Sequence, residues 1–195
     1  GPSVRLMRDL LGFIALTKKV KLRFYSGDRN NVVLSLSMVR IAGAREAKMK
    51  LASCTVKGRK CYGMITDAGL QTPQESFLKQ YPDLKSMLAA GVLSEFAAAL
   101  GETVPLEQLT FEPPILRPEK IMAVGMNYLE HIKEMGREPP RYPTVFVRYP
   151  DSLVGHGHNL VRPRVSDNYD YEGELAIIIG KPARYVSKVE ALDYV

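Results

Sequence analysis

Apolar and polar positions follow a regular pattern from Met49 onward. Residues 51–56 and 61–66 form two apolar, strand-like runs on either side of Lys57-Gly58, a dipeptide typical of a tight turn. A second turn signal follows at residues 67–69. The pattern therefore predicts a β-hairpin at the start of the folded region.

Two short helices are predicted between residues 83 and 100. Apolar side chains recur there at helical spacing in two groups separated by Gly91, and Gly101 is typical of a helix C-terminal stop. The segment Phe111–Pro118 then carries three prolines in eight residues. We expect it to be a stiff, extended connector and a domain boundary. The two apolar groups are Leu84, Met87 and Leu88, and then Val92, Leu93, Phe96 and Leu100.

A strand followed by a helix is predicted after the connector. Residues 120–125 form a short apolar run that ends in Gly125, and residues 127–136 follow with helical spacing. Asn127 is a suitable N-cap whose third helical residue would be Glu130, the spacing of a capping box. Gly136 is suited to the C-terminal stop of this helix.

His131 and Glu134 are three residues apart on the predicted helix, so they share one face and can touch. A carboxylate beside an imidazole fixes its tautomer and makes it a better general base. The same spacing is also compatible with an ordinary pair of polar side chains on an exposed helix. The residues alone leave both interpretations open.

Residues 170–180 combine acidic side chains with a β-branched apolar run that Gly180 closes, which predicts a buried strand. Side chains alternate along a strand, so Glu172 and Glu174 would emerge on one face. A divalent cation would offset the cost of burying two carboxylates, and oxygen ligands suit hard ions such as Mg²⁺, Mn²⁺ or Ca²⁺. The alternative is an exposed strand start with both glutamates in water.

Another strand is predicted at Thr144–Arg148, within a segment rich in proline and glycine. Arg148 at its end could bind an anionic substrate group or be a surface charge. We interpret His156-Gly157-His158 as a turn rather than a metal-binding pair, because Gly155 and Gly157 punctuate it and no third soft ligand is near.

The composition is that of a globular protein: 46% of the 195 residues are hydrophobic and 25% are charged. This length allows one domain with a sizeable core, or a small domain and part of another. No run approaches the roughly 18 apolar residues of a membrane span, so we expect no membrane partner. Cys54 and Cys61 could face each other across the hairpin, and we interpret them as reduced thiols.

The net charge of +6 is concentrated in residues 1–48, which hold ten basic and three acidic residues. The remaining residues are nearly balanced, which argues against a nucleic-acid partner for the folded region. We interpret residues 1–48 as an extension outside the fold: a tag, an upstream-translated segment or a transit peptide. The protein would accordingly be cytoplasmic, or mitochondrial if this segment targets it there.

Several motifs, taken in order, closely resemble the fumarylacetoacetate hydrolase family. The resemblance covers residues from about 49 to the end, and the combination is far more specific than any single motif. The matching motifs are Gly125-x-Asn127-Tyr128-x-x-His131-x-x-Glu134, Phe146–Arg148, Leu153–Gly155, Asp170–Leu175 and Ala191–Val195.

The resemblance implies a site with three kinds of residue. Glu172 and Glu174 would bind Mg²⁺ or Mn²⁺, with Ca²⁺ a further candidate, and His131 with Glu134 would activate water. Substrate contacts would come from Asn127, Tyr128 and Arg148, although many relatives have Lys where this chain has Arg148.

The implied fold class is α+β. Residues 1–48 are the basic extension, residues 49–118 a small N-terminal α/β domain with its connector, and residues 119–195 the opening of a β-rich roll of mixed sandwich and barrel character. Family members are usually dimers, so we expect a homodimer at full length. An aspartate ligand and later strands would lie beyond Val195, so we expect this chain alone to be inactive.

The implied activity is hydrolysis of a carbon–carbon bond in an acylpyruvate- or fumarylpyruvate-type β-diketo acid through a metal-stabilised enolate. The family also includes isomerases of hydroxymuconate-type diacids and decarboxylases of oxaloacetate, and residues 49–195 do not separate these activities. A non-catalytic fragment that lacks the third metal ligand is the other alternative.

Overall fold

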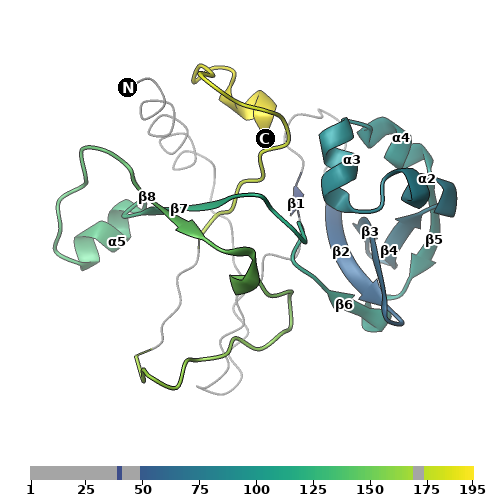
Figure 1. Ribbon diagram of the computed structural model, residues 1–195, viewed down its shortest axis with the longest axis horizontal. Coiled ribbons are helices and arrows are strands. Elements are labelled where there is room, and N and C mark those ends of the chain that lie inside the picture. Colours follow the sequence, from purple (N-terminus) through teal and green to yellow (C-terminus); the bar gives the residue numbers. More distant parts are fainter. Residues whose placement is uncertain (1–38, 41–48, 169–173) are drawn as a thin grey trace. The chain divides into compact units, whose positions relative to one another are not determined.

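A computed structural model describes residues 39–40, 49–168 and 174–195. The described residues form two compact units, and the main boundary between them falls between Arg117 and Pro118, at the end of the proline-rich connector. The first unit contains residues 39–40, 49–117, 153–168 and 174–180; the second contains residues 118–152 and 181–195. Figure 1 shows the elements of both units.

The first unit is an antiparallel sheet with three short helices on one face (Figure 1). The strand order is β1-β2-β3-β4-β5, and β6 also pairs with β2. All of these pairings are antiparallel and the helices follow one another in sequence, which is an α+β arrangement. The elements are β1 Val39–Arg40, β2 Lys50–Val56, β3 Arg59–Thr66, β4 Gly69–Pro73, α2 Glu75–Gln80, α3 Leu84–Ala90, α4 Leu93–Ala98, β5 Leu100–Val104, η1 Leu106–Gln108 and β6 Leu109–Phe111.

The predicted hairpin is confirmed, with β2 and β3 joined by a two-residue turn. Lys57 has a φ of 48° and Gly58 a φ of 79°, the positive values that a type I′ turn requires at both central positions. The register places Cys54 opposite Cys61, and both cysteines are free thiols, as interpreted from the sequence.

The two predicted helices are confirmed as α3 and α4. Asp83 caps α3 through a capping box with Ser86, whose backbone N–H donates to the Asp83 carboxylate at 2.7 Å. Gly91 ends α3 with a left-handed φ of 69°. The prediction that Gly101 stops the second helix is wrong, because α4 ends at Ala98 and Gly101 lies in β5. The backbone of this segment forms its hydrogen bonds in the antiparallel pairing of β5 with β4 and not in a helix.

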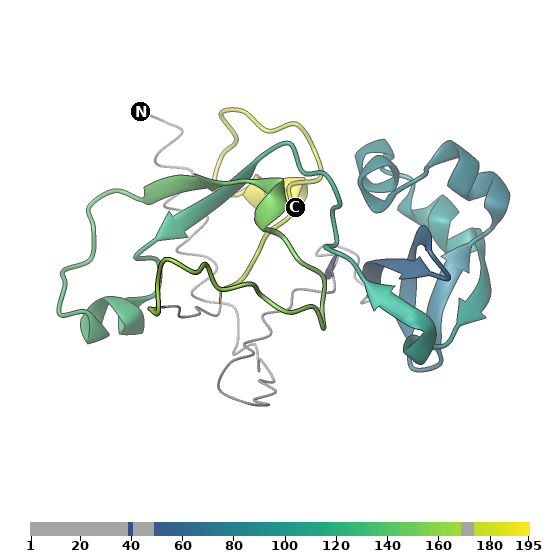
Figure 2. The same cartoon turned by 60° about the horizontal axis from the view of Figure 1, so that its bottom comes forward.

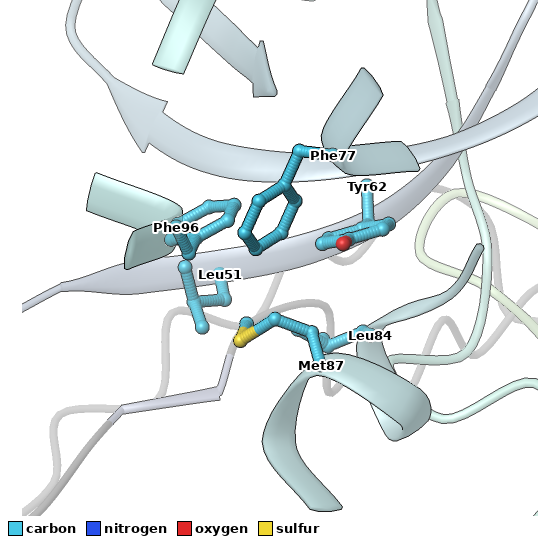
Figure 3. Close-up of a cluster of buried hydrophobic side chains, with 6 residues drawn as sticks. All are labelled: Leu51, Tyr62, Phe77, Leu84, Met87 and Phe96. Carbon is cyan, nitrogen blue, oxygen red and sulfur yellow. The ribbon is translucent and has the colours of Figure 1, made fainter. Parts of the chain in front are cut away.

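The hydrophobic core lies between the sheet and the helices (Figure 3). The Tyr62 ring stacks near Phe96 with centroids 6.0 Å apart, and its hydroxyl donates to the Tyr81 carbonyl at 2.8 Å. Each large side chain buried here contributes about 1.5–3 kcal/mol of transfer free energy. The cluster consists of Leu51, Tyr62, Phe77, Leu84, Met87 and Phe96.

The proline-rich connector is tied to β2 before the chain leaves the first unit. The Glu112 N–H donates to the Ser53 carbonyl at 2.9 Å, and the Ser53 hydroxyl donates to the Pro114 carbonyl at 2.7 Å. The Thr55 hydroxyl donates to the Glu112 carboxylate at 2.7 Å. These bonds fix the connector against the sheet edge as an extended segment.

The second unit is built on a two-stranded antiparallel sheet of β7, Ile121–Gly125, and β8, Thr144–Arg148. Both strands and the helix between them are confirmed; the helix, α5, spans Leu129–Glu134. Figure 2 shows the two strands side by side, with α5 on the connection between them. Two short 3-10 helices complete this unit, η2 Pro150–Ser152 and η3 Ala191–Tyr194.

The predicted strand at residues 170–180 is wrong for its described part. Residues 174–180 have no strand conformation, and 45% of Leu175 and 54% of Ile179 is exposed. A buried strand needs a neighbour for its backbone hydrogen bonds, and no described strand pairs with these residues. The rest of that prediction lies outside the described residues.

Candidate functional site

Helix α5 carries the two candidate catalytic side chains. Its N-cap is Tyr128, and no side chain caps it, so the predicted capping box of Asn127 and Glu130 is wrong. The helix begins later than the sequence pattern indicates, which leaves Asn127 one residue before the cap. The Glu130 carboxylate instead accepts from Lys133 Nζ at 2.8 Å.

The C-terminal end of α5 is fixed by a Schellman motif. Gly136 has a φ of 62°, its N–H donates to the Lys133 carbonyl at 2.9 Å, and the Arg137 N–H donates to the Ile132 carbonyl at 3.1 Å. The predicted stop at Gly136 is therefore confirmed. Ile132, 2% exposed, is the buried residue of the helix.

His131 and Glu134 are brought together on α5. The imidazole Nδ1 lies 3.8 Å from the carboxylate Oε2, and 44% and 78% of the two side chains are exposed. An exposed pair of this spacing adds only about 0.3–0.5 kcal/mol to stability. The pair therefore contributes little to the stability of the fold, and it places a carboxylate beside an accessible imidazole, an arrangement that can support proton transfer.

The three candidate substrate-binding residues lie in the same unit at two ends of the β7–β8 ladder. Half-buried Asn127 and exposed Tyr128 follow the Gly125 end, which pairs with Thr144. Arg148 is exposed at the other end, opposite Ile121. Four residues of extended strand separate the two ends by about 14 Å along the backbone. The structure groups Asn127 and Tyr128 and sets the Arg148 backbone apart from them.

The predicted metal ligands are not assembled by the described part of the chain. Glu172 lies outside the described residues, and Glu174 is exposed in the segment that clusters with the first unit. The carboxylate oxygens have the right chemistry for a hard divalent ion. Within residues 49–168 and 174–195, however, no group of three His, Cys, Asp or Glu side chains is arranged to hold one.

His156-Gly157-His158 is a turn, as predicted. Gly157 has a φ of 82°, and the His158 N–H donates to the Gly155 carbonyl at 3.2 Å. The His156 ring meets Phe111 edge-on, with centroids 5.7 Å apart. These contacts anchor the turn on β6 and give His156 a packing role.

The two thiols of the hairpin are poor nucleophiles. Burial raises the pKa of Cys54 to about 12, with further contributions from Cys61 and the Glu112 carboxylate. Burial also raises the pKa of Cys61. Since the thiolate is the reactive species, this pair does not provide a nucleophilic centre.

Met126 is a feature of this region that the sequence did not reveal. Its φ is 53°, in the left-handed region that non-glycine residues seldom occupy. A methionine after a strand carries no signal for that conformation.

Among the described residues, no helix is long and apolar enough to span a membrane.

Comparison with known proteins shows what the part of the chain that carries α5 is similar to. Residues 120–195 match the family described as fumarylacetoacetate (FAA) hydrolase C-terminal. The chain is 46% identical over 80 residues to the uncharacterized protein PH0643 of Pyrococcus horikoshii, covering 41% of this chain and 35% of that protein. It is 37% identical over 98 residues to human mitochondrial oxaloacetate tautomerase FAHD2A, covering 50% and 31%.

The chain thus spans about a third of the length of these two relatives. A solved structure assigned to the HpcE proteins of Mycobacterium smegmatis superposes with a TM-score of 0.45 and 22% identity, over 57% of this chain and 40% of the other. Residues 120–195 are therefore similar to the C-terminal domain of the fumarylacetoacetate hydrolase family.

Proposed function

We propose that this chain contributes the proton-transfer dyad of an enzyme that hydrolyses a carbon–carbon bond in an acylpyruvate- or fumarylpyruvate-type β-diketo acid. The observation that carries the proposal is the 3.8 Å approach of His131 Nδ1 to Glu134 Oε2 on the solvent-accessible side of α5. The family match of residues 120–195 supports it. In this proposal residues 119–195 form the opening part of the β-rich catalytic roll.

In the proposed reaction His131 acts as the general base. Its Nδ1–H faces the Glu134 carboxylate, which aligns the ring and stabilises the imidazolium that forms. Nε2 accepts a proton from water, and the resulting hydroxide attacks the carbonyl carbon distal to the carboxylate. The adjacent carbon–carbon bond then breaks, and its electron pair stays on the pyruvate-like half. The protonated His131 returns its proton to that half.

We propose Glu172 and Glu174 as ligands of a Mg²⁺ or Mn²⁺ ion, because carboxylate oxygens are the donors such ions prefer. When bound, the ion would supply positive charge beside the keto-acid oxygens. Asn127 and Tyr128 follow β7 directly and are proposed to orient the substrate. Arg148 is proposed to bind a distal carboxylate, since its guanidinium can form two parallel hydrogen bonds with such a group.

A second candidate is tautomerisation of an oxaloacetate-type keto acid. It is favoured by the 37% identity to the human oxaloacetate tautomerase and by 36% identity to its bovine counterpart. The same dyad would then move a proton between carbon and oxygen, and no water would be consumed. Isomerisation of a hydroxymuconate-type diacid and decarboxylation of oxaloacetate would begin with the same enolate-forming step.

The two candidates differ in their products. The full-length enzyme that contains this chain would be incubated with Mg²⁺ or Mn²⁺ and with acylpyruvate, oxaloacetate or a hydroxymuconate in parallel. Release of pyruvate from acylpyruvate supports the hydrolase, whereas faster enol–keto conversion of oxaloacetate without bond cleavage supports the tautomerase. Glu130→Gln is a matched control, because this exposed carboxylate lies on the same helix and pairs with Lys133. A hydrolysis rate unchanged by His131→Ala would refute the proposed base.

We also propose that the protein acts in the cytoplasm or in mitochondria. The mitochondrial alternative is supported by the human and bovine relatives, whose names describe them as mitochondrial. The basic excess of residues 1–48 is compatible with targeting. Fusing these residues to a fluorescent protein would test this, and a diffuse cytoplasmic signal would exclude the mitochondrial alternative.

A further inference from the structure

Met126 occupies a left-handed backbone conformation at the point where the chain leaves β7 for α5. Its φ is 53°, and among the other non-glycine residues in the described part of the chain only Lys57 and Tyr185 also have a positive φ. The conformation of Lys57 is required by the hairpin turn that contains it. No turn of that kind accounts for Met126. In this conformation the Cβ of an L-residue crowds the following carbonyl, so the fold must hold the residue there.

Helix α5 has few other means of fixing its direction. It is only six residues long, no side chain caps its N-terminus, and Ile132 is its buried residue. The Schellman motif at Gly136 defines how the chain leaves the helix. The direction in which the helix begins is set by the three residues that join it to β7, and Tyr128 among them is extended, with φ −109° and ψ 120°.

Strand β7 is the fixed reference for this connection, because all five of its residues pair with β8. A rotation about the Met126 φ bond therefore swings α5 as a body relative to the ladder. His131 and Glu134 are carried on that body, five and eight residues after Met126. The same rotation carries Asn127 and Tyr128, so the Met126 torsion sets the position of this turn and of the dyad relative to the β7–β8 ladder and to Arg148 at its other end.

We infer that Met126 is a positioning residue, whose left-handed conformation orients α5 and so holds the His131–Glu134 pair in place relative to the β7–β8 ladder and the proposed substrate contact Arg148. This inference rests on the proposed function of the dyad. A glycine at this position would adopt the same φ without crowding, but two consecutive glycines would leave the torsion free. The half-buried methionine restricts that freedom.

Three substitutions separate conformation from side-chain packing. Asparagine tolerates the left-handed region, glycine permits it without holding it, and β-branched isoleucine opposes it while keeping an apolar side chain. Tyr185→Ile is the matched control, because Tyr185 has a φ of 56° in an exposed loop of the same unit. The Tyr185→Ile variant places a β-branched residue at a left-handed position and leaves the connection between β7 and α5 unchanged.

The expected results follow the tolerance of each residue for positive φ. Met126→Ile should lower kcat by about 10²-fold with little change in KM, because a displacement of about 1 Å in a catalytic group has that effect. It should also speed hydrogen exchange at the Ile132 and Arg137 amides. Met126→Asn should retain the wild-type rate and exchange, and Met126→Gly should fall between the two. Tyr185→Ile should leave both measurements unchanged.

Two results would overturn the inference: wild-type exchange and kcat in Met126→Ile, or the same loss in Tyr185→Ile. If Met126→Ile does not fold, faster exchange of the α5 amides in Met126→Gly than in Met126→Asn supports the inference, and equal exchange overturns it. Absence of turnover in the wild-type full-length enzyme would count against the proposed function alone, because the exchange measurements still report whether Met126 holds α5.

Discussion

Gly155 lies so close to Phe111 that a Cβ atom on it would come within 1.8 Å of the Phe111 carbonyl oxygen. The contact joins two segments of the first unit that are more than forty residues apart in the sequence, and the neighbouring His156 ring packs edge-on against the Phe111 ring. Only glycine permits this approach of two backbones. The close approach of the two backbones and the ring contact therefore pack the turn at residues 155–158 against β6.

Substituting alanine for Gly155 should destabilise the first unit. The added methyl group would meet backbone atoms, which cannot rotate away, so we expect a loss of about 1–3 kcal/mol in the free energy of unfolding. Gly101→Ala is the control, because its Cβ would meet its nearest atom at 3.5 Å, an ordinary contact. Urea unfolding measures both. Equal stability of the two variants would show that the segment shifts without cost.

Most of the local structure could be predicted from the sequence where pattern and turn chemistry agree. The β2–β3 hairpin, helix α3 with its stop at Gly91, and the β7–α5–β8 order all follow from apolar spacing between glycine-rich turns. These elements satisfy their backbone hydrogen bonds with near neighbours, so local sequence determines them.

The predictions failed where distant partners decide the structure. Gly101 looks like a helix stop, but pairing of β5 with β4 places it in a strand. The run ending at Gly180 looks like a buried strand, but residues 174–180 have no described partner strand. Asn127 looks like an N-cap, but the chain turns at Met126 and α5 begins later. Residue types alone determine neither the backbone torsion of Met126 nor whether residues 174–180 have a strand to pair with.

The hairpin thiols predict how stability changes with pH. The pKa of Cys54 is raised from 9.0 to about 12 in the folded protein, so its contribution is present below pH 9 and is lost as the pH rises from 9 toward 12. One thiol changes the free energy of unfolding by at most about 1.4 kcal/mol per pH unit in that window. Denaturant midpoints at pH 8 and pH 10 measure the effect. Cys54→Ala should flatten the dependence, and an unchanged slope in that variant would assign it to other groups.

Tyr62 contributes to the core through both its ring and its hydroxyl. Tyr62→Phe removes the donor to the Tyr81 carbonyl while keeping the ring near Phe96. Loss of this bond should lower the free energy of unfolding by about 0.5–1.5 kcal/mol. Burial also raises the pKa of the Tyr62 hydroxyl, so the variant should lose less stability than the wild type above pH 10. Thermal unfolding at pH 7 and pH 10.5 tests both statements, and a Phe variant as stable as wild type would contradict the first.

The proposed dyad and the proposed ligands should fail in different ways when they are changed. Since the His131–Glu134 pair is largely exposed, His131→Ala should leave the unfolding free energy within about 0.5 kcal/mol of wild type. It should lower turnover by about 10²–10⁴-fold while Mg²⁺ or Mn²⁺ affinity is kept. Glu174→Gln should instead weaken the binding of the metal, because a neutral amide is a poorer ligand for a hard cation than a carboxylate. Calorimetric titration and initial rates on both variants separate the two roles; an unchanged metal affinity in Glu174→Gln, or a weakened one in His131→Ala, would show that the roles are assigned to the wrong residues.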